Sequence, residues 1–132
     1  ANTDCRQDGS ALGHGPREGW LFNSGLAGIE HADAILIVGA NPRTEAPLLN
    51  THLRKAWLNG KTGIGLIGEQ VNLTYDYSWL GAGSRTVTKM PKAALDFLTK
   101  AERPAIIVGA GAVSGAETSS SAASSPFSFM AE

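Results

Sequence analysis

The chain has 132 residues, of which 42% are hydrophobic and 17% charged, and its formal net charge is −1 at neutral pH. That length corresponds to one domain with a modest core. The near-neutral balance argues against a nucleic-acid partner, which a basic surface would attract. The single cysteine, Cys5, excludes an internal disulfide and a cysteine-ligated iron–sulfur cluster within this chain alone. No apolar run approaches the roughly 20 residues that span a bilayer, so no direct membrane insertion is expected.

The clearest pattern is a strand, a turn and a helix in the first half of the chain. Ala34–Val38 is a continuous apolar run, typical of a strand buried on both faces. Asn41 and Pro42 then predict a turn. We expect Thr44 to cap a helix that runs to Asn59, because that cap places Pro47 in the first turn, where its missing N–H is tolerated.

The second half repeats the alternation of strands and helices. Gly63–Ile67 is expected to be the second strand, close enough along the chain to complete a strand–helix–strand unit. Residues 69–85 show no clear regular structure, but apolar and polar positions alternate from Leu73 to Trp79, which predicts either an edge strand or an aromatic-packed loop. Pro91 opens a predicted helix, Pro104 ends it, and Ala105–Val108 is expected to form a third buried strand. The predicted fold is α/β, a Rossmann-like three-layer fragment with a mostly parallel sheet.

The two ends differ from the middle in composition. Residues 1–22 are rich in Gly and Pro turn signals and predict an irregular lead-in, and residues 23–113 form the predicted α/β domain. Residues 114–132 contain seven serines and predict a flexible tail. Because the chain begins at Ala1 without a methionine, we expect it to be a piece of a longer protein.

Two glycine motifs resemble phosphate-binding loops. Gly63–Gly68 matches the GxGxxG pattern, but its intervening residues are the predicted strand and no helix pattern follows, so close packing of a helix explains it better. Gly109, Gly111 and Gly115 follow a predicted strand, although with an extra residue in the spacing and a polar sequence where a helix should begin. Neither motif predicts a nucleotide site strongly.

The turn Gly39–Arg43 lies where open α/β sheets place their ligands, at the carboxyl end of a strand. Asn41 suits hydrogen bonding to a ligand edge and Arg43 suits an anion. The alternative is that Asn41 and Thr44 only satisfy the amides of the turn and the helix start. Both interpretations remain open, and the three histidines have no metal-ligand spacing, so no metal site and no catalytic residue is predicted.

Four stretches of the sequence carry a family resemblance. The run Leu21–Trp57, together with Asp4–Ser10, Ile67–Tyr77 and Arg103–Ala112, resembles the large iron–sulfur subunit of NADH:quinone oxidoreductase, respiratory complex I, of the alphaproteobacterial and mitochondrial type. The part resembled is the C-terminal domain, which is similar in fold to molybdopterin oxidoreductases such as formate dehydrogenase.

The resemblance implies a lost cofactor site. In the molybdopterin enzymes this layer holds a guanine dinucleotide of the cofactor, contacted by a G-x-N-P sequence after a strand. Here Gly39, Asn41, Pro42 and Arg43 would be vestigial counterparts, and no cofactor is expected. The relatives follow their next strand with an Asp-Pro-Arg-like sequence, where this chain has Gly68–Gln70.

The resemblance also implies a role. The parent subunit would take part in electron transfer from NADH to quinone coupled to proton translocation, and would carry 4Fe–4S and 2Fe–2S clusters outside this chain. The segment itself would be a non-catalytic scaffold contacting other peripheral-arm subunits, on the cytoplasmic side of a bacterial inner membrane or the matrix side of the mitochondrial one. The alternative is a module that binds molybdopterin guanine dinucleotide or a nucleotide.

Overall fold

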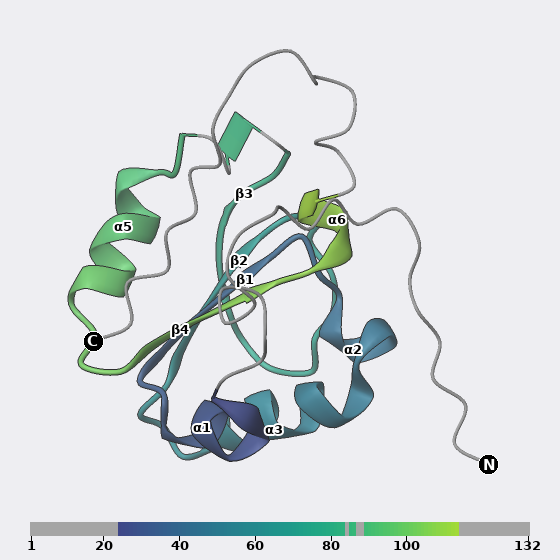
Figure 1. Ribbon diagram of the computed structural model, residues 1–132, viewed down its shortest axis with the longest axis vertical. Helices are drawn as coiled ribbons and strands as arrows, with labels where there is room; N and C mark the ends of the chain where they lie inside the picture. The colour runs from purple at the N-terminus through teal and green to yellow at the C-terminus, as the bar shows by residue number, and fades with distance from the viewer. Residues whose placement is uncertain (1–23, 84, 87–88, 114–132) are drawn as a thin grey trace.

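The computed structural model describes residues 24–83, 85–86 and 89–113. Four strands form one sheet in the order β3-β2-β1-β4, and every neighbouring pair is parallel. Helices cover both faces of this sheet (Figure 1). The predicted α/β fold with a mostly parallel sheet is confirmed. The expectations for residues 1–22 and 114–132 lie outside the described residues.

Strand β1 (Ala34–Val38) is the centre of the sheet. It pairs with β2 (Gly63–Ile67) on one side and with β4 (Pro104–Val108) on the other, and all five of its residues are buried. A strand with both edges paired and both faces covered presents only apolar side chains, which explains its uninterrupted hydrophobic sequence. The prediction of an interior strand here is confirmed.

One face of the sheet packs against α1 (Gly25–His31) and α3 (Pro47–Leu58). Ile35 and Ile37 of β1 meet Leu53 and Ala56 of α3 in a core cluster that also contains Ile29. These positions are three apart on the helix and two apart on the strand, which is how each element directs side chains to one face.

The predicted start of the first long helix is wrong. Thr44, the expected cap, lies inside a separate short helix, α2 (Pro42–Glu45), which follows Asn41. The long helix α3 begins only at Pro47. Ala46 separates the two helices with φ −144° and ψ 71°. A residue before proline is pushed out of the helical region by contact with the proline ring, so the chain breaks at Ala46. Pro47 lies in the first turn of α3, as expected, but Ala46 and not Thr44 precedes that helix.

The opposite face packs against α5 (Lys92–Thr99), seen to the left in Figure 1. Leu36 and Val38 of β1 lie in a cluster with Ala94 of this helix. A Cβ built on Gly63 would lie 3.0 Å from the ring of Phe97. The glycines of β2 therefore allow α5 to approach, as expected, and no helix follows Gly68 directly in the described residues.

Both interpretations of residues 69–85 are correct for different parts of that segment. Strand β3 (Ser78–Gly81) pairs with β2 at the edge of the sheet, with a register shift between Leu66 and Ile67. The loop before it is packed by Leu73 and Tyr75, which are buried in the cluster on the α3 side.

The expectation of a third buried strand is wrong in one respect. β4 forms, but it lies at the edge of the sheet and its residues alternate between exposed and half-buried. Apolar sequence predicted complete burial, whereas a strand paired on only one side keeps part of its surface open. A short helix, α6 (Ala110–Val113), follows β4 directly, where the polar sequence farther on argued against one.

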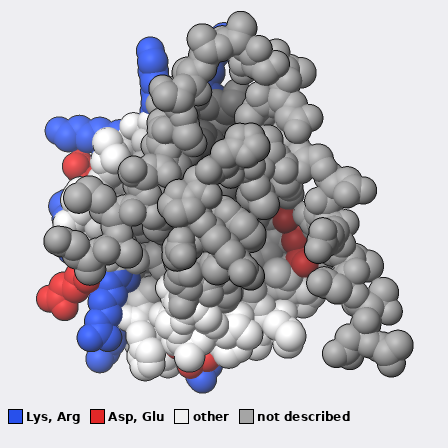
Figure 2. Space-filling view, viewed as in Figure 1, with Lys and Arg blue, Asp and Glu red and all other residues white. Residues whose placement is uncertain are grey.

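Charged side chains of both signs mix along the left edge of the face shown in Figure 2, where grey residues are not described. In the ranges that the structure covers, no helix is long and apolar enough to cross a membrane.

Candidate functional site

The strand order places a topological switch point between β1 and β4. The chain passes from β1 to β2 on one side of β1, whereas β4 pairs with β1 on its other side, so the strand order reverses between these two strands. Crevices at such points are where open α/β sheets bind ligands. A depression of about 510 Å³ lies here, lined by residues that include Gly39, Asn41, Gly68 and Gly111.

Backbone contact closes much of this crevice. Gly39 has φ +60°, and a Cβ built on it would lie 2.4 Å from the amide nitrogen of Ala112 in α6. A Cβ on Gly109 would lie 2.4 Å from Cβ of Ala40, and one on Gly111 would lie 2.7 Å from the carbonyl oxygen of Gly39. The glycines predicted as possible phosphate-loop residues therefore bring the two loops together.

Asn41 uses its main chain within the turn. Its N–H donates to Oε1 of Glu45 at 2.7 Å, and its carbonyl accepts from the N–H groups of Thr44 and Glu45. Its side-chain oxygen Oδ1 is buried and has no hydrogen-bond partner among the described residues. An unpaired buried amide oxygen is unfavourable, and among the buried side-chain nitrogen and oxygen atoms of the described residues this is the one without a partner.

Arg43 does not join the depression. Its Nη1 donates to the main-chain carbonyl of Asn72 at 2.9 Å, which ties α2 to the loop before β3. Pro42 is buried at the first position of α2. Of the four residues that the sequence marked as vestigial candidates, Gly39 and Asn41 therefore line the depression, whereas Pro42 and Arg43 serve the local structure.

The electrostatic character of the depression is acidic. Glu45 and Glu69 line it, and the lining includes no Lys, Arg or His among the described residues. Two carboxylates raise the free energy of any phosphate placed beside them. The sequence analysis singled out neither carboxylate as a site residue, and it noted Glu69 only within Gly68–Gln70, where the chain departs from the relatives. The position of Glu69, two residues after a parallel strand, was the signal for its place at the corner.

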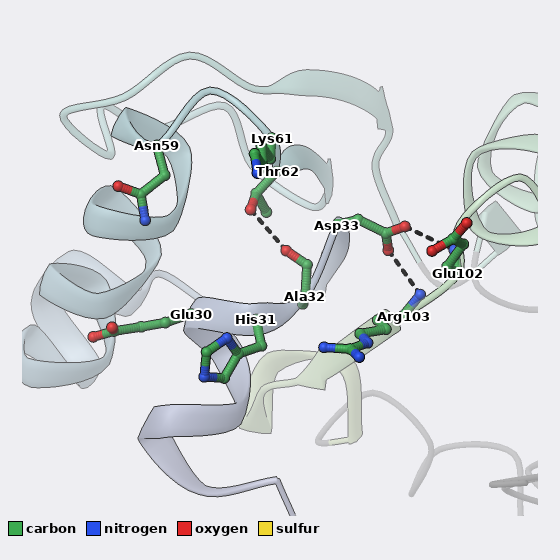
Figure 3. A pocket seen from close by; sticks show the side chains of 9 residues that line it. All are labelled: Glu30, His31, Ala32, Asp33, Asn59, Lys61, Thr62, Glu102 and Arg103. Atoms are coloured by element: carbon green, nitrogen blue, oxygen red, sulfur yellow. Dashed lines mark hydrogen bonds between the residues drawn. The ribbon is translucent and has the colours of Figure 1, made fainter.

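A second depression, of about 370 Å³, lies at the amino end of the sheet (Figure 3). Here the carboxylate of Asp33 accepts from the N–H groups of Glu102 and Arg103 at 2.7 and 2.9 Å. The hydrogen bond from Glu102 N–H is the largest of the causes that lower the pKa of Asp33. Thr62 Oγ1 donates to the carbonyl of Ala32 at 2.7 Å. These bonds join the starts of three strands, so this cluster is structural.

Metal-ligating residues do not gather in the described ranges, where no group of three or more His, Cys, Asp or Glu side chains has metal-binding geometry. His52 Nδ1 instead lies 2.5 Å from Oε1 of Glu30, and Lys55 Nζ lies 2.6 Å from Oε2 of the same carboxylate. This cluster joins α1 to α3. Cys5 and His14 lie outside the described residues.

Comparisons with known proteins identify relatives of this chain. The profile of the family described as molybdopterin oxidoreductase matches residues 1–124. The chain is 41% identical over 110 residues to the mitochondrial NADH-ubiquinone oxidoreductase 78 kDa subunit of Candida albicans, covering 83% of this chain and 15% of that protein. It is 42% identical over 105 residues to the subunit of the same name from Neurospora crassa, covering 76% and 14% respectively.

A plant protein is also similar. The mitochondrial NADH dehydrogenase (ubiquinone) iron-sulfur protein 1 of Solanum tuberosum is 33% identical over 113 residues, covering 83% of this chain and 15% of that protein. The chain thus spans about one seventh of the length of these curated relatives. The resemblance inferred from the sequence motifs is confirmed.

Proposed function

Because the chain belongs to the molybdopterin oxidoreductase family, we propose that it is a structural segment of the large iron–sulfur subunit of an NADH:quinone oxidoreductase. Three relatives named as subunits or iron-sulfur proteins of that enzyme support this proposal. The parent enzyme would transfer electrons from NADH to quinone and couple the transfer to proton translocation. The segment itself would provide scaffolding and no catalytic group.

The observation that carries the scaffold role is the closure of the switch-point corner. The family implies a molybdopterin guanine dinucleotide, whose phosphates need N–H donors or cations. The residues present do not fit that group. The backbone of α6 fills the space over Gly39, Glu45 and Glu69 line what remains, and Arg43 is turned toward Asn72. Gly39, Asn41, Pro42 and Arg43 are therefore proposed to be a vestigial site.

A second candidate function is a module that still binds a nucleotide. One observation, the unpaired side-chain oxygen of Asn41, favours it. Oδ1 of Asn41 is buried beside the depression and has no partner among the described residues, and an amide oxygen accepts well from the N–H groups of a guanine edge. This candidate requires the purine to be held without its phosphates entering the acidic corner.

Calorimetric titration separates the two candidates. We expect guanosine monophosphate, guanosine diphosphate and isolated molybdopterin to give no binding heat with the chain. Micromolar binding that is lost in Asn41→Ala and kept in Asn59→Ala, an exposed asparagine at the end of α3, would establish the module and overturn the scaffold role. If both variants keep the binding, the ligand binds away from Asn41. That result would also contradict the proposal that the chain is a scaffold that binds no ligand.

The redox centres of the parent are proposed to lie outside this chain. A 4Fe–4S cluster is held by four cysteine thiolates, and the 132 residues contain one cysteine. After anaerobic reconstitution with iron and sulfide, the purified chain should show no cluster absorbance in the visible range. A stoichiometric chromophore that chelators remove would contradict this assignment.

The partners are proposed to be other peripheral-arm subunits of the complex, with no nucleic acid and no direct membrane insertion. The location would be the matrix side of the mitochondrial inner membrane or the cytoplasmic side of a bacterial one, and the names of the mitochondrial relatives support the first. Membrane fractionation followed by native gel electrophoresis tests this assignment. The subunit should be found with the inner membrane and should co-migrate with NADH:quinone oxidoreductase activity on the gel.

A further inference from the structure

The link between α3 and β2 contains the one Asn-Gly pair of the sequence, Asn59–Gly60. Asparagine followed by glycine is prone to a spontaneous reaction, because no Cβ shields the amide nitrogen of the glycine. That nitrogen attacks Cγ of the asparagine side chain and forms a five-membered succinimide ring, with release of ammonia. Water then opens the ring at either of its two carbonyls, which leaves aspartate or isoaspartate in place of the asparagine.

The structure presents the side chain that would react. Asn59 and Gly60 are both exposed, and Asn59 lines the depression at the amino end of the sheet. Figure 3 shows its side chain at the end of α3, where no hydrogen bond joins it to the other residues drawn. Within that set of residues, nothing holds Cγ of Asn59 away from the backbone that follows it.

The attacking nitrogen, by contrast, is restrained. The N–H of Gly60 donates to the carbonyl of Trp57 at 2.9 Å. Asn59 follows the last residue of α3 with φ −68° and ψ −6°. At this ψ the nitrogen of Gly60 eclipses the nitrogen of Asn59, whereas ring closure requires it on the side of Cβ. The reaction therefore needs one hydrogen bond to break and the backbone to rotate at the end of the helix.

We propose that Asn59 is a site of spontaneous deamidation, and that opening of the C-terminal end of α3 sets its rate. Helix ends open more readily than helix centres, because their last carbonyls have no intrahelical partner. In the open state, hydroxide takes the proton of the Gly60 N–H, the nitrogen bonds to Cγ, and the side-chain amide leaves as ammonia with a proton from water. The reaction needs no oxidant and no cofactor, and it is independent of the proposed function.

The product places a negative charge where it is unfavourable. A carboxylate at the C-terminal end of a helix opposes the helix dipole. The depression that Asn59 lines already contains the carboxylates of Glu30, Asp33 and Glu102, beside the cations of Lys61 and Arg103. Conversion of the amide should therefore loosen the end of α3. Accordingly, Asn59→Asp should speed hydrogen exchange of the Gly60 amide by about two- to fivefold relative to the unmodified protein.

Peptide mass spectrometry tests the site. The intact protein would be incubated under native conditions and in concentrated urea, and each asparagine followed by the mass change that replaces an amide with a carboxyl group. In urea, Asn59 should convert faster than Asn72, an exposed asparagine followed by a bulky leucine. Under native conditions Asn59 should convert at least about tenfold more slowly than in urea. Conversion of Asn72 first, or equal rates for Asn59 in the two conditions, would overturn the proposal.

Charge variants at the end of α3 test whether its opening sets the rate. Leu58 is the last residue of α3 and is 62% exposed. A cation there favours the helix dipole and an anion opposes it, so Leu58→Lys should lower the native rate at Asn59 by about two- to fivefold and Leu58→Glu should raise it as much. Each native rate is divided by the rate of the same variant in urea, which cancels the effect of the charge on the chemistry itself.

The matched control lies at the other end of the same helix. Leu48, in the first turn of α3, is 74% exposed, and Leu48→Lys and Leu48→Glu should leave the native-to-urea ratio at Asn59 unchanged. Helix-dipole effects act within the first or last turn, so a charge at position 48 does not reach the end that opens. A ratio that responds equally at both positions, or at neither, would contradict control by the C-terminal end of α3.

Discussion

At the scale of single residues, one buried asparagine joins two parts of the core. Asn50 on α3 is 8% exposed, donates from Nδ2 to the carbonyl of Leu73 at 3.2 Å, and accepts at Oδ1 from the hydroxyl of Tyr75 at 2.9 Å. Burial raises the pKa of the Tyr75 phenol, so the hydroxyl keeps its proton and remains a donor. The pair fixes the loop before β3 against the helix.

Tyr75→Phe should lower the free energy of unfolding by about 1–3 kcal/mol, because Oδ1 of Asn50 stays buried without a donor. Urea denaturation measures the loss. The comparison variant is Tyr77→Phe, whose hydroxyl donates to the carbonyl of Val71 and accepts from the N–H of Val71 in a less buried position. A double-mutant cycle with Asn50→Ala should give a coupling of about 0.5–3 kcal/mol between positions 50 and 75. Purely additive effects would show that the hydrogen bond contributes nothing.

Gly39 is required by the closure of the switch-point corner. Gly39→Ala should destabilise the protein by more than Gly60→Ala, which adopts a similar positive φ of 70° but has no atom within 4 Å of an added Cβ. The control should lose about 1–2 kcal/mol from the left-handed backbone alone. The additional loss in the free energy of unfolding of Gly39→Ala, measured by the same denaturation experiment, reports the collision of the added Cβ with Ala112. Equal losses would mean that α6 moves aside freely.

At the scale of elements, α1 and α3 are linked by one carboxylate. Glu30 accepts from Lys55 and His52, and the hydrogen bond from Lys55 is the larger cause that lowers the pKa of Glu30 from its ordinary value of 4.5. A carboxylate whose pKa is lower in the folded state stabilises the fold above its unfolded pKa. That contribution is lost as the pH falls through the lower, folded pKa.

The melting temperature should therefore fall below pH 4.5 more steeply in the wild-type chain than in Glu30→Gln, and the two should converge at the acid end. Differential scanning calorimetry between neutral pH and about pH 3 measures this. Glu69→Gln, an exposed carboxylate outside the cluster, is the control. Parallel curves for the wild type and Glu30→Gln would show that the link between α1 and α3 does not affect stability.

At the scale of the whole molecule, the sheet has a buried centre and a partly exposed edge strand. Leu36 of β1 and Ile106 of β4 are register partners on adjacent strands, but Leu36 is fully buried and Ile106 is 38% exposed. They share one face, so the difference in exposure follows from strand position: β1 is paired on both sides, whereas β4 is paired on one side among the described strands.

Leu36→Ala should lower the free energy of unfolding by about 2–5 kcal/mol, because it leaves a cavity in the core. Ile106→Ala should lower it by clearly less in this chain, since part of that side chain is already in water. Chemical denaturation of both variants measures the difference. Similar losses at the two positions would mean that β4 is as enclosed as β1 in solution.

Local sequence predicted β1, β2 and the parallel α/β fold correctly, because a continuous apolar run bounded by turn residues is typical of a strand in a covered parallel sheet. It misplaced the start of α3, since the effect of Pro47 depends on whether the chain continues or breaks at Ala46. Local sequence also predicted full burial for β4. An apolar pattern indicates that a strand favours burial, but it does not tell whether the strand lies at the centre or at the edge of the sheet.

The sequence by itself determined the fold class and the family, since both follow from patterns within short stretches such as Ala34–Arg43. The tertiary structure alone decided the state of the switch-point corner. Gly39 meets Ala112, and Arg43 reaches Asn72, across long separations along the chain. Contacts of this kind depend on how the elements pack, and packing brings together residues that no local spacing relates.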